Sequence, residues 1–215
     1  MDKIDRYIEA HTSPEEPLLA ELDRATNLQV VQPKMISGRV QGAFLKMLVQ
    51  ILRPQAVLEI GTFTGYSALS MAAGLAEGAE LHTIEVDDEL QQLGQEFFDR
   101  SPHGHKITLH IGSALEIAPT LGLSFDLVFI DGDKRQYPAY LQMLLGDDGS
   151  SPLVHSGSII LADNVLWYGK VTEEVKASDK MSQGILEFNR LTAADPRLEN
   201  VILPLRDGIN MIRVK

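Results

Sequence analysis

The sequence contains no cysteine, which excludes disulfide bonds, thiolate nucleophiles and cysteine-based zinc sites. Positive charge is also scarce, because 19 Lys and Arg residues stand against 30 Asp and Glu residues and leave a net charge of −11. A surface that follows nucleic acid phosphates needs a basic stripe, so we expect no nucleic acid partner. No apolar run approaches the about 18 residues of a membrane span, and Met1–Glu9 lacks the apolar centre of a signal peptide. These absences predict a cytoplasmic protein without membrane contact that acts on small molecules.

The length of 215 residues is enough for one well-buried α/β domain. We expect a single domain over residues 1–215, with a helical cover over residues 1–52 and an α/β core over residues 53–215. The cover is predicted to contain three helices. They are Met1–His11, a second helix that is capped at Ser13 with Pro14 in its first turn, and Ser37–Ile51.

From Ala56 onward, strand and helix patterns alternate, which is typical of a parallel sheet with helices on both faces. The strand candidates are Ala56–Ile60, Glu80–Ile84, Lys106–Ile111, Phe125–Ile130, Ser158–Leu161, Leu198–Leu203 and Ile209–Val214. The helix candidates between them are Ser67–Leu75, Asp88–Arg100, Leu115–Leu121, Tyr137–Leu145 and Met181–Thr192. The last two strands flank an Asp-Gly turn and predict an antiparallel hairpin. The predicted fold is therefore α/β and Rossmann-like, with a mostly parallel seven-stranded sheet.

A strand, a glycine-containing turn and a helix start occupy Ala56–Ser67, an arrangement that binds nucleotide cofactors in such folds. The spacing from Gly61 to Gly65 is not the dinucleotide fingerprint GxGxxG. Glu59 would repel a pyrophosphate and would suit the ammonium and sulfonium groups of S-adenosylmethionine. Glu85, at the end of the next strand, can accept hydrogen bonds from ribose hydroxyls, as it also could in a nicotinamide enzyme. The residues favour a methyl donor and leave an NAD-dependent oxidoreductase open as an alternative.

Asp131, Asp163 and Asn164 follow the fourth and fifth strands, whose carboxyl ends meet at one edge of the sheet. Oxygen ligands of this kind suit a hard divalent cation, Mg²⁺ first, with Mn²⁺ or Ca²⁺ also compatible. Such residues also commonly end strands and cap helices without binding anything.

Lys134 follows Asp131 closely and is expected at the same edge, where a lysine beside a cation can act as a general base. The alternative is a solvent-exposed lysine, the usual environment of this residue. Trp167 and Tyr168 follow Asn164 and could either line an aromatic acceptor site or pack a loop.

Three stretches resemble one enzyme family: LEIGTFTGYSAL (Leu58–Leu69), FDLVFIDGDKRQY (Phe125–Tyr137) and LADNVLWYGKV (Leu161–Val171). They are similar, in the same order, to motifs of the cation-dependent O-methyltransferases, the caffeoyl-CoA and catechol O-methyltransferase family. The resemblance extends from the N-terminal helices to the final hairpin. It implies a class I methyltransferase fold, S-adenosylmethionine as the donor, a divalent cation and a homodimer.

The resemblance also implies roles for single residues. Donor contacts fall on Ser37, Glu59, Gly61, Thr62, Ser67, Glu85, Ala114, Asp131 and Asp133, with Glu85 at the ribose and Ala114 at the adenine. By the same resemblance, Asp131, Asp163 and Asn164 would bind the cation, and Lys134 matches the catalytic lysine of the family. Trp167 and Tyr168 lie where acceptor contacts are expected.

The sequence departs from the plant members of that family at three places. Tyr168 replaces an asparagine, the loop Gly146–Pro152 is longer, and the N-terminal segment is short. These differences argue against a plant-type acyl-CoA acceptor. We therefore predict methyl transfer to a catechol-like small molecule, with a non-catalytic donor-binding protein as a further alternative.

Overall fold

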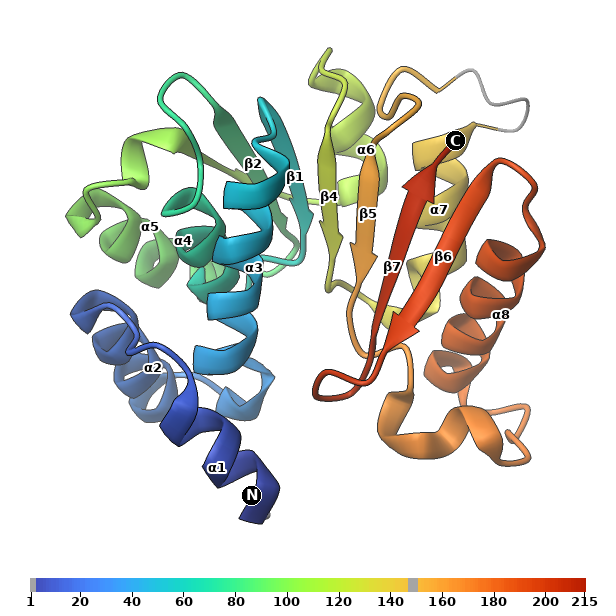
Figure 1. Ribbon diagram of the computed structural model, residues 1–215, viewed down its shortest axis with the longest axis horizontal. Helices are drawn as coiled ribbons and strands as arrows, with labels where there is room; N and C mark the ends of the chain where they lie inside the picture. Colours follow the sequence, from blue (N-terminus) through green and yellow to red (C-terminus); the bar gives the residue numbers. More distant parts are fainter. Residues whose placement is uncertain (1–2, 147–150) are drawn as a thin grey trace.

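The computed structural model describes residues 3–146 and 151–215. Seven strands form one sheet in the order β3–β2–β1–β4–β5–β7–β6 (Figure 1). The strands are β1 (Ala56–Ile60), β2 (Glu80–Glu85), β3 (Ile107–Ile111), β4 (Leu127–Ile130), β5 (Ile159–Ala162), β6 (Leu198–Leu203) and β7 (Ile209–Val214). Strands β1 to β5 pair in parallel, whereas β7 is antiparallel to both β5 and β6. The predicted α/β sheet with its antiparallel hairpin is therefore confirmed.

Helices lie on both sides of this sheet, as its alternating sequence predicts. They are α1 (Lys3–His11), α2 (Pro17–Gln29), α3 (Gly38–Leu52), α4 (Tyr66–Ala72), α5 (Gln91–Arg100), α6 (Ala114–Ile117), α7 (Tyr137–Leu145) and α8 (Lys180–Ala194). In Figure 1, α3 and α4 lie in front of the sheet, whereas α6, α7 and α8 lie behind it.

Two hydrophobic cores follow from this arrangement, because successive side chains of a strand point to opposite faces. The core behind the sheet joins strand residues such as Leu58 and Val128 to Phe188 of α8. The core in front joins Val57 and Phe129 to Leu45 of α3. Each strand of the middle of the sheet is thus covered on both sides, which explains the continuous apolar runs in the sequence.

One half of the front face is open in the described part of the chain. In Figure 1 no helix of residues 3–146 and 151–215 lies in front of β6 and β7. Val201 of β6 pairs with Met211 of β7, which pairs with Leu161 of the front core, so all three side chains point forward. Val201 is 51% exposed. We call Val201, Leu203 and Met211 the uncovered face of the hairpin.

The predicted start of the second helix is wrong. Helix α2 begins at Pro17, not at Ser13-Pro14, and its N-cap residue Glu16 makes no capping bond with its side chain. The carbonyl of Ser13 accepts a hydrogen bond from Nε of Arg39 in α3, so this segment is used to connect helices. Pro17 supplies the favourable proline at the first turn instead.

Other element ends shift by a few residues, as is common for helix termini. The predicted helix Leu115–Leu121 is split into α6 and a 3₁₀ turn at Ala118–Thr120. The predicted length difference in the loop Gly146–Pro152 lies largely outside the described residues, which omit 147–150. Within the part of the chain that is described, we find no helix with the length and apolar character that crossing a membrane requires.

Candidate active site at the carboxyl edge of the sheet

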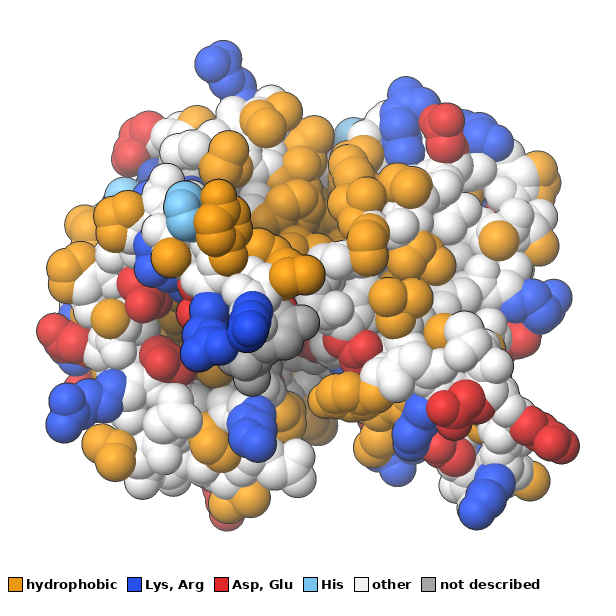
Figure 2. Space-filling view, turned by 60° about the horizontal axis from the view of Figure 1, so that its bottom comes forward, with side chains coloured by type: hydrophobic (Ala, Val, Ile, Leu, Met, Phe, Trp, Pro, Cys, Tyr) orange, Lys and Arg blue, Asp and Glu red, His pale blue; other side chains and the backbone are white. Residues whose placement is uncertain are grey.

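The candidate residues gather where the parallel strands end. In Figure 1 the arrowheads of β4 and β5 point to the lower side of the molecule, and Figure 2 turns this side toward the reader. Its surface is hollowed between the half with the N-terminal helices and the half with the C-terminal elements. Ligands of open α/β sheets bind at this edge.

Gly61 lets the ends of β1 and β4 approach each other closely. A Cβ atom at Gly61 would lie 2.4 Å from the carbonyl oxygen of Asp131, and the backbone φ angle of Gly61 is +97°. The amide of Asp131 donates to the carbonyl of Ile60 at 2.8 Å. A Cβ atom at Gly65 would lie 2.5 Å from the ring of Phe98. Both glycines are therefore required by contacts within the protein itself.

Glu59 is a fully buried carboxyl group beneath this turn. Its Oε2 accepts a hydrogen bond of 2.5 Å from the hydroxyl of Thr83, which lies 2.5 Å from the hydroxyl of Thr62. Its Oε1 has no hydrogen-bond partner among the described residues. Burial raises the pKa of Glu59 to about 8, and the hydroxyls of Ser67 and Thr83 oppose this rise. A cationic ligand nearby would favour the ionised form.

Glu85 ends β2 with a carboxylate that the backbone holds in place. Its Oε2 accepts from the amide of Phe63 at 2.7 Å, and its Oε1 accepts from Val86 and Asp87 at 2.9 and 3.0 Å. The contact with Phe63 joins Glu85 to the glycine-containing turn. A carboxylate oxygen has further lone pairs, so ribose hydroxyls could also be accepted.

The remaining predicted donor residues lie around the same edge. Ser37 and Ser67 are buried at the starts of α3 and α4, and Ala114 is buried at the start of α6. Asp133 lies farther out and forms a bidentate pair with Arg135, whose Nε donates to Oδ1 and whose Nη2 donates to Oδ2, and these hydrogen bonds hold the pKa of Asp133 below its usual value.

Lys134 is buried, with only 8% of its surface exposed, so the expectation of a solvent-exposed lysine does not apply. Its Nζ donates to Oδ1 of Asp131 at 2.6 Å and to the hydroxyl of Tyr137 at 2.8 Å. The Tyr137 hydroxyl lies within donating distance of the carbonyls of Ile130 and Asp163, at 3.1 and 3.0 Å. Tyr137 therefore links the lysine to the ends of β4 and β5.

Asp163 is a buried carboxylate at the end of β5, and no cationic side chain of the described residues is in direct hydrogen-bonding contact with it. Its Oδ2 accepts from Nε2 of Gln41 at 2.7 Å, and its Oδ1 accepts from the amide of Asn164 at 2.7 Å. Oε1 of Gln41 in turn accepts from Nη1 of Arg206 at 3.1 Å. Gln41 and Arg206 were missed by sequence reasoning, because they lie 122 and 43 residues from Asp163 along the chain.

The predicted cation ligands Asp131, Asp163 and Asn164 come from two adjacent strand ends. Burial and the neighbouring charge of Asp163 together raise the pKa of Asp131 to about 6, although Lys134 opposes the rise. The two carboxylates therefore act on each other electrostatically. In the described ranges, no group of three or more His, Cys, Asp or Glu residues is placed to hold a metal ion. Two carboxylates and one amide oxygen nevertheless are a set of hard oxygen donors of the kind that binds divalent cations. A bound cation would also relieve the repulsion between the two carboxylates.

The loop after β5 has an unusual backbone. Asn164, Trp167 and Tyr168 all adopt left-handed φ angles of +57°, +48° and +56°, a conformation that costs about 1–3 kcal/mol each. Asp207 in the hairpin turn supports this loop, because its Oδ1 accepts from the amide of Tyr168 at 2.7 Å. Trp167 is half-buried and packs on the rear core, whereas Tyr168 is 80% exposed.

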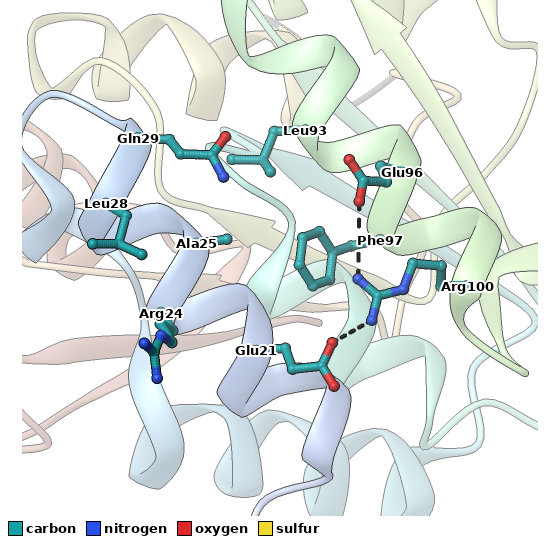
Figure 3. A pocket seen from close by; sticks show the side chains of 9 residues that line it. All are labelled: Glu21, Arg24, Ala25, Leu28, Gln29, Leu93, Glu96, Phe97 and Arg100. Atoms are coloured by element: carbon teal, nitrogen blue, oxygen red, sulfur yellow. Dashed lines mark hydrogen bonds and ion pairs between the residues drawn. The ribbon is translucent and has the colours of Figure 1, made fainter.

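A shallow pocket lies elsewhere, between α2 and α5. Figure 3 shows Leu28 and Phe97 at this pocket, with Arg100 paired to Glu21 and Glu96. None of the predicted site residues lines it. It is therefore separate from the candidate active site.

A family model described as O-methyltransferase matches residues 9–215. Caffeoyl-CoA O-methyltransferase of Petroselinum crispum is 30% identical over 224 residues, covering 99% of this chain and 90% of the relative.

Solved structures show the same fold. The SAH-bound methyltransferase PaMTH1 of Podospora anserina superposes with a TM-score of 0.89 at 28% identity, covering 100% of this chain and 94% of that chain. An O-methyltransferase of Bacillus cereus in complex with SAH superposes with a TM-score of 0.85 at 30% identity, covering 99% and 97%. These chains match this one over nearly their full lengths.

Proposed function

Because the chain belongs to the O-methyltransferase family over residues 9–215, we propose that it transfers a methyl group from S-adenosylmethionine to a hydroxyl of a catechol-like small molecule with the help of a divalent cation. The observation that carries this proposal is the meeting of Lys134, Asp131 and Asp163 at one edge of the sheet. The fold is that of the class I methyltransferases, as the structural matches indicate.

The donor would occupy the edge formed by β1, β2 and β3. S-Adenosylmethionine supplies a methyl group on a positively charged sulfur. Glu59, with one oxygen unpaired, suits the cationic methionine part, together with Gly61, Thr62, Ser67 and Ser37. Glu85 would accept the ribose hydroxyls, Ala114 would leave room for adenine, and Asp131 and Asp133 would lie on the donor side. The SAH-bound relatives support this assignment.

Asp131, Asp163 and Asn164 would hold the divalent cation. When bound, such a cation supplies Lewis-acid stabilisation of an ionising hydroxyl and fixes two vicinal oxygens. Mg²⁺ is the first choice for this oxygen donor set, with Mn²⁺ and Ca²⁺ also suited.

Lys134, in its neutral amine form, would accept the proton of the acceptor hydroxyl at Nζ, and a divalent cation bound nearby would favour that form over the ammonium that pairs with Asp131. The hydrogen bonds to Asp131 and Tyr137 fix the position of Nζ, so little orientational freedom is lost when the proton moves. Because the lysine is buried, bulk water competes poorly at this position. Trp167 and Tyr168 would line the acceptor site, and the ring of Tyr168 is exposed there.

A methyl-transfer assay tests the proposal. The enzyme is incubated with S-adenosylmethionine and a panel of catechols and hydroxycinnamoyl compounds, with added Mg²⁺ or with excess chelator, and SAH is measured. We expect turnover of catechols that chelator abolishes and Mg²⁺ restores. Turnover that persists in excess chelator would remove the cation from the proposal and leave the methyl transfer intact.

Two alternative functions were compatible with the sequence. The family match is to methyltransferases, which speaks against an NAD-dependent oxidoreductase. The same assay decides about a non-catalytic donor-binding protein, since that protein would bind SAH without turning over any acceptor.

A homodimer is part of the proposal. The uncovered face of the hairpin exposes Val201 beside half-buried Met211, and the exposed residue Val201 would be covered by a second copy. Figure 2 shows hydrophobic side chains gathered in the middle of its upper half, toward which the front of Figure 1 is turned. A cytoplasmic location and the absence of nucleic acid and membrane partners stay predictions.

A further inference from the structure

We infer that Gln41 and Arg206 position Asp163 for the divalent cation, and that the cation affinity of the protein depends on this pair. The inference rests on the proposed function, because it concerns the proposed cation site. Gln41 belongs to α3 in the N-terminal cover, and Arg206 belongs to the turn between β6 and β7. Neither residue is among the predicted ligands.

The contacts form a continuous chain of three side chains. Gln41 is 1% exposed, and its Nε2 donates to Oδ2 of Asp163 at 2.7 Å. Nη1 of Arg206 donates to Oε1 of Gln41 at 3.1 Å and to the carbonyl of Ile36 at 3.2 Å. The other oxygen of Asp163 accepts from the amide of Asn164, so both oxygens are oriented.

Arg206 selects the orientation of the Gln41 amide. A guanidinium is only a donor and an ionised carboxylate is only an acceptor, whereas a glutamine amide has one end of each kind. If the amide were reversed, its oxygen would face Asp163 and its NH₂ group would face Arg206, and both contacts would be repulsive. The donor end of Gln41 is therefore directed at Asp163 by a residue that does not touch Asp163.

This arrangement orients Asp163 without neutralising it. Oδ1 of Asp131 pairs directly with the ammonium Nζ of Lys134 at 2.6 Å. At Asp163 the neutral amide of Gln41 stands between the carboxylate and the guanidinium, so the positive charge of Arg206 is kept one side chain away. A cationic side chain in direct contact would compete with a metal ion for the carboxylate oxygens. The geometry thus leaves the negative charge of Asp163 less neutralised than that of Asp131 and available to a cation.

The alternative is a purely structural role, in which Gln41 only connects α3 to the end of β5. In that case its loss would lower the stability of the fold and leave cation binding unchanged. Partners that orient metal ligands typically change metal affinity by about 10- to 100-fold when they are removed. The two interpretations therefore differ in a quantity that does not require turnover.

The test is Gln41→Met, which keeps the side-chain length and removes both hydrogen-bonding ends. Mn²⁺ affinity is measured by titration calorimetry and by the electron paramagnetic resonance signal of free Mn²⁺. We expect binding about 10- to 100-fold weaker than in the unchanged protein, with SAH affinity in metal-free buffer unchanged. The matched control is Gln50→Met on the exposed side of α3, which should bind Mn²⁺ as the unchanged protein does.

Arg206→Met gives a second test that does not alter the buried helix face. Arg206 acts electrostatically on Asp131, so removal of its charge alone would strengthen Mn²⁺ binding. The positioning role predicts the opposite, a loss of Mn²⁺ affinity of several-fold or more. Unchanged or tighter Mn²⁺ binding in folded Arg206→Met, or affinity within twofold of the unchanged protein in folded Gln41→Met, would overturn the inference. Failure of the unchanged protein to bind Mn²⁺ would instead remove the cation from the proposed function, and the inference with it.

Discussion

At Glu59 the fold surrounds a carboxyl group with protein and raises its pKa to about 8, because burial disfavours the charged form. An unfolded chain would return this group to the ordinary value of 4.5. Between these two values the folded protein binds more protons than the unfolded one, so its stability falls as the pH rises. The contribution of protonated Glu59 to the stability of the fold is fully present below pH 4.5. This contribution is lost as the pH rises through about 8, the pKa of Glu59 in the folded protein.

We therefore predict that Glu59→Gln removes this pH dependence. The glutamine oxygen can still accept from Thr83, and no charge can form. Urea unfolding at pH 5, 7 and 9 should show the unchanged protein losing stability relative to the variant as pH rises, by on the order of a few kcal/mol in total. The exposed Glu80→Gln serves as the control and should follow the unchanged protein. Parallel curves for Glu59→Gln and the unchanged protein would contradict the prediction.

Glu85 is predicted to be needed for donor binding. Glu85→Ala removes the acceptor for the proposed ribose hydroxyls and also frees the amide of Phe63 in the glycine-containing turn. We expect a loss of SAH affinity of about 1–3 kcal/mol in calorimetry. Glu80→Ala, at the other end of β2, should bind SAH normally. Unchanged SAH affinity in Glu85→Ala would exclude this role.

Lys134 is predicted to act as the general base. Lys134→Met should lower turnover by about 100- to 10,000-fold, while SAH and Mn²⁺ still bind. The exposed Lys170→Met is a control that should keep its turnover. Partial recovery of the Lys134→Met rate at high pH would support a base role, because hydroxide can then take the proton. Full turnover of the variant at neutral pH would show that Lys134 is not required.

At the scale of the elements, alternation of apolar runs and helical patterns was enough to predict every strand and the hairpin. The strand ends then indicated Asp131, Asp163 and Lys134, because the carboxyl ends of parallel strands share one edge. The pattern could not predict Gln41 and Arg206, whose contacts join α3, β5 and the hairpin turn across more than a hundred residues. It also placed the start of α2 wrongly, because Ser13 and Pro14 are a good local cap that tertiary contacts override.

Helix α8 supports Lys134 through a glycine. A Cβ atom at Gly184 would lie 2.2 Å from the carbonyl oxygen of Lys134, so the helix backbone rests on the segment that carries the lysine. Gly184→Ala should therefore lower stability by about 1–3 kcal/mol and lower turnover by displacing Lys134. Gly94→Ala in α5 is the matched control, because the nearest atom to its Cβ would be 3.8 Å away.

These two glycine variants are compared by urea unfolding and by the methyl-transfer assay. Gly94→Ala should be neutral or slightly stabilising, since alanine favours a helix over glycine. Equal stability and turnover of both variants would mean that α8 can move without disturbing Lys134.

At the scale of the whole molecule, the proposed donor and cation residues follow the carboxyl ends of neighbouring strands of one sheet. Most of the proposed donor residues lie at the ends of β1, β2 and β3, whereas Asp131 and Asp133, the proposed cation residues and the lysine follow β4 and β5. The hairpin turn after β6 reaches both the loop that follows β5 and helix α3 of the N-terminal cover. The hairpin therefore holds the loop after β5 and helix α3 together, while no helix of the described residues covers its own front face.

That open face leads to the prediction of a homodimer. Val201 is 51% exposed in the middle of β6, and a charge placed there would be buried if a second copy covered the face. A charged residue without a partner in an interface is strongly unfavourable, so Val201→Lys should convert a dimer to a monomer. Sedimentation velocity over a range of concentrations measures the change. The control is Val31→Lys, since Val31 is 84% exposed in the N-terminal cover and should tolerate the charge. A Val201→Lys protein that stays dimeric would place the interface elsewhere, and a monomeric unchanged protein would exclude the dimer altogether.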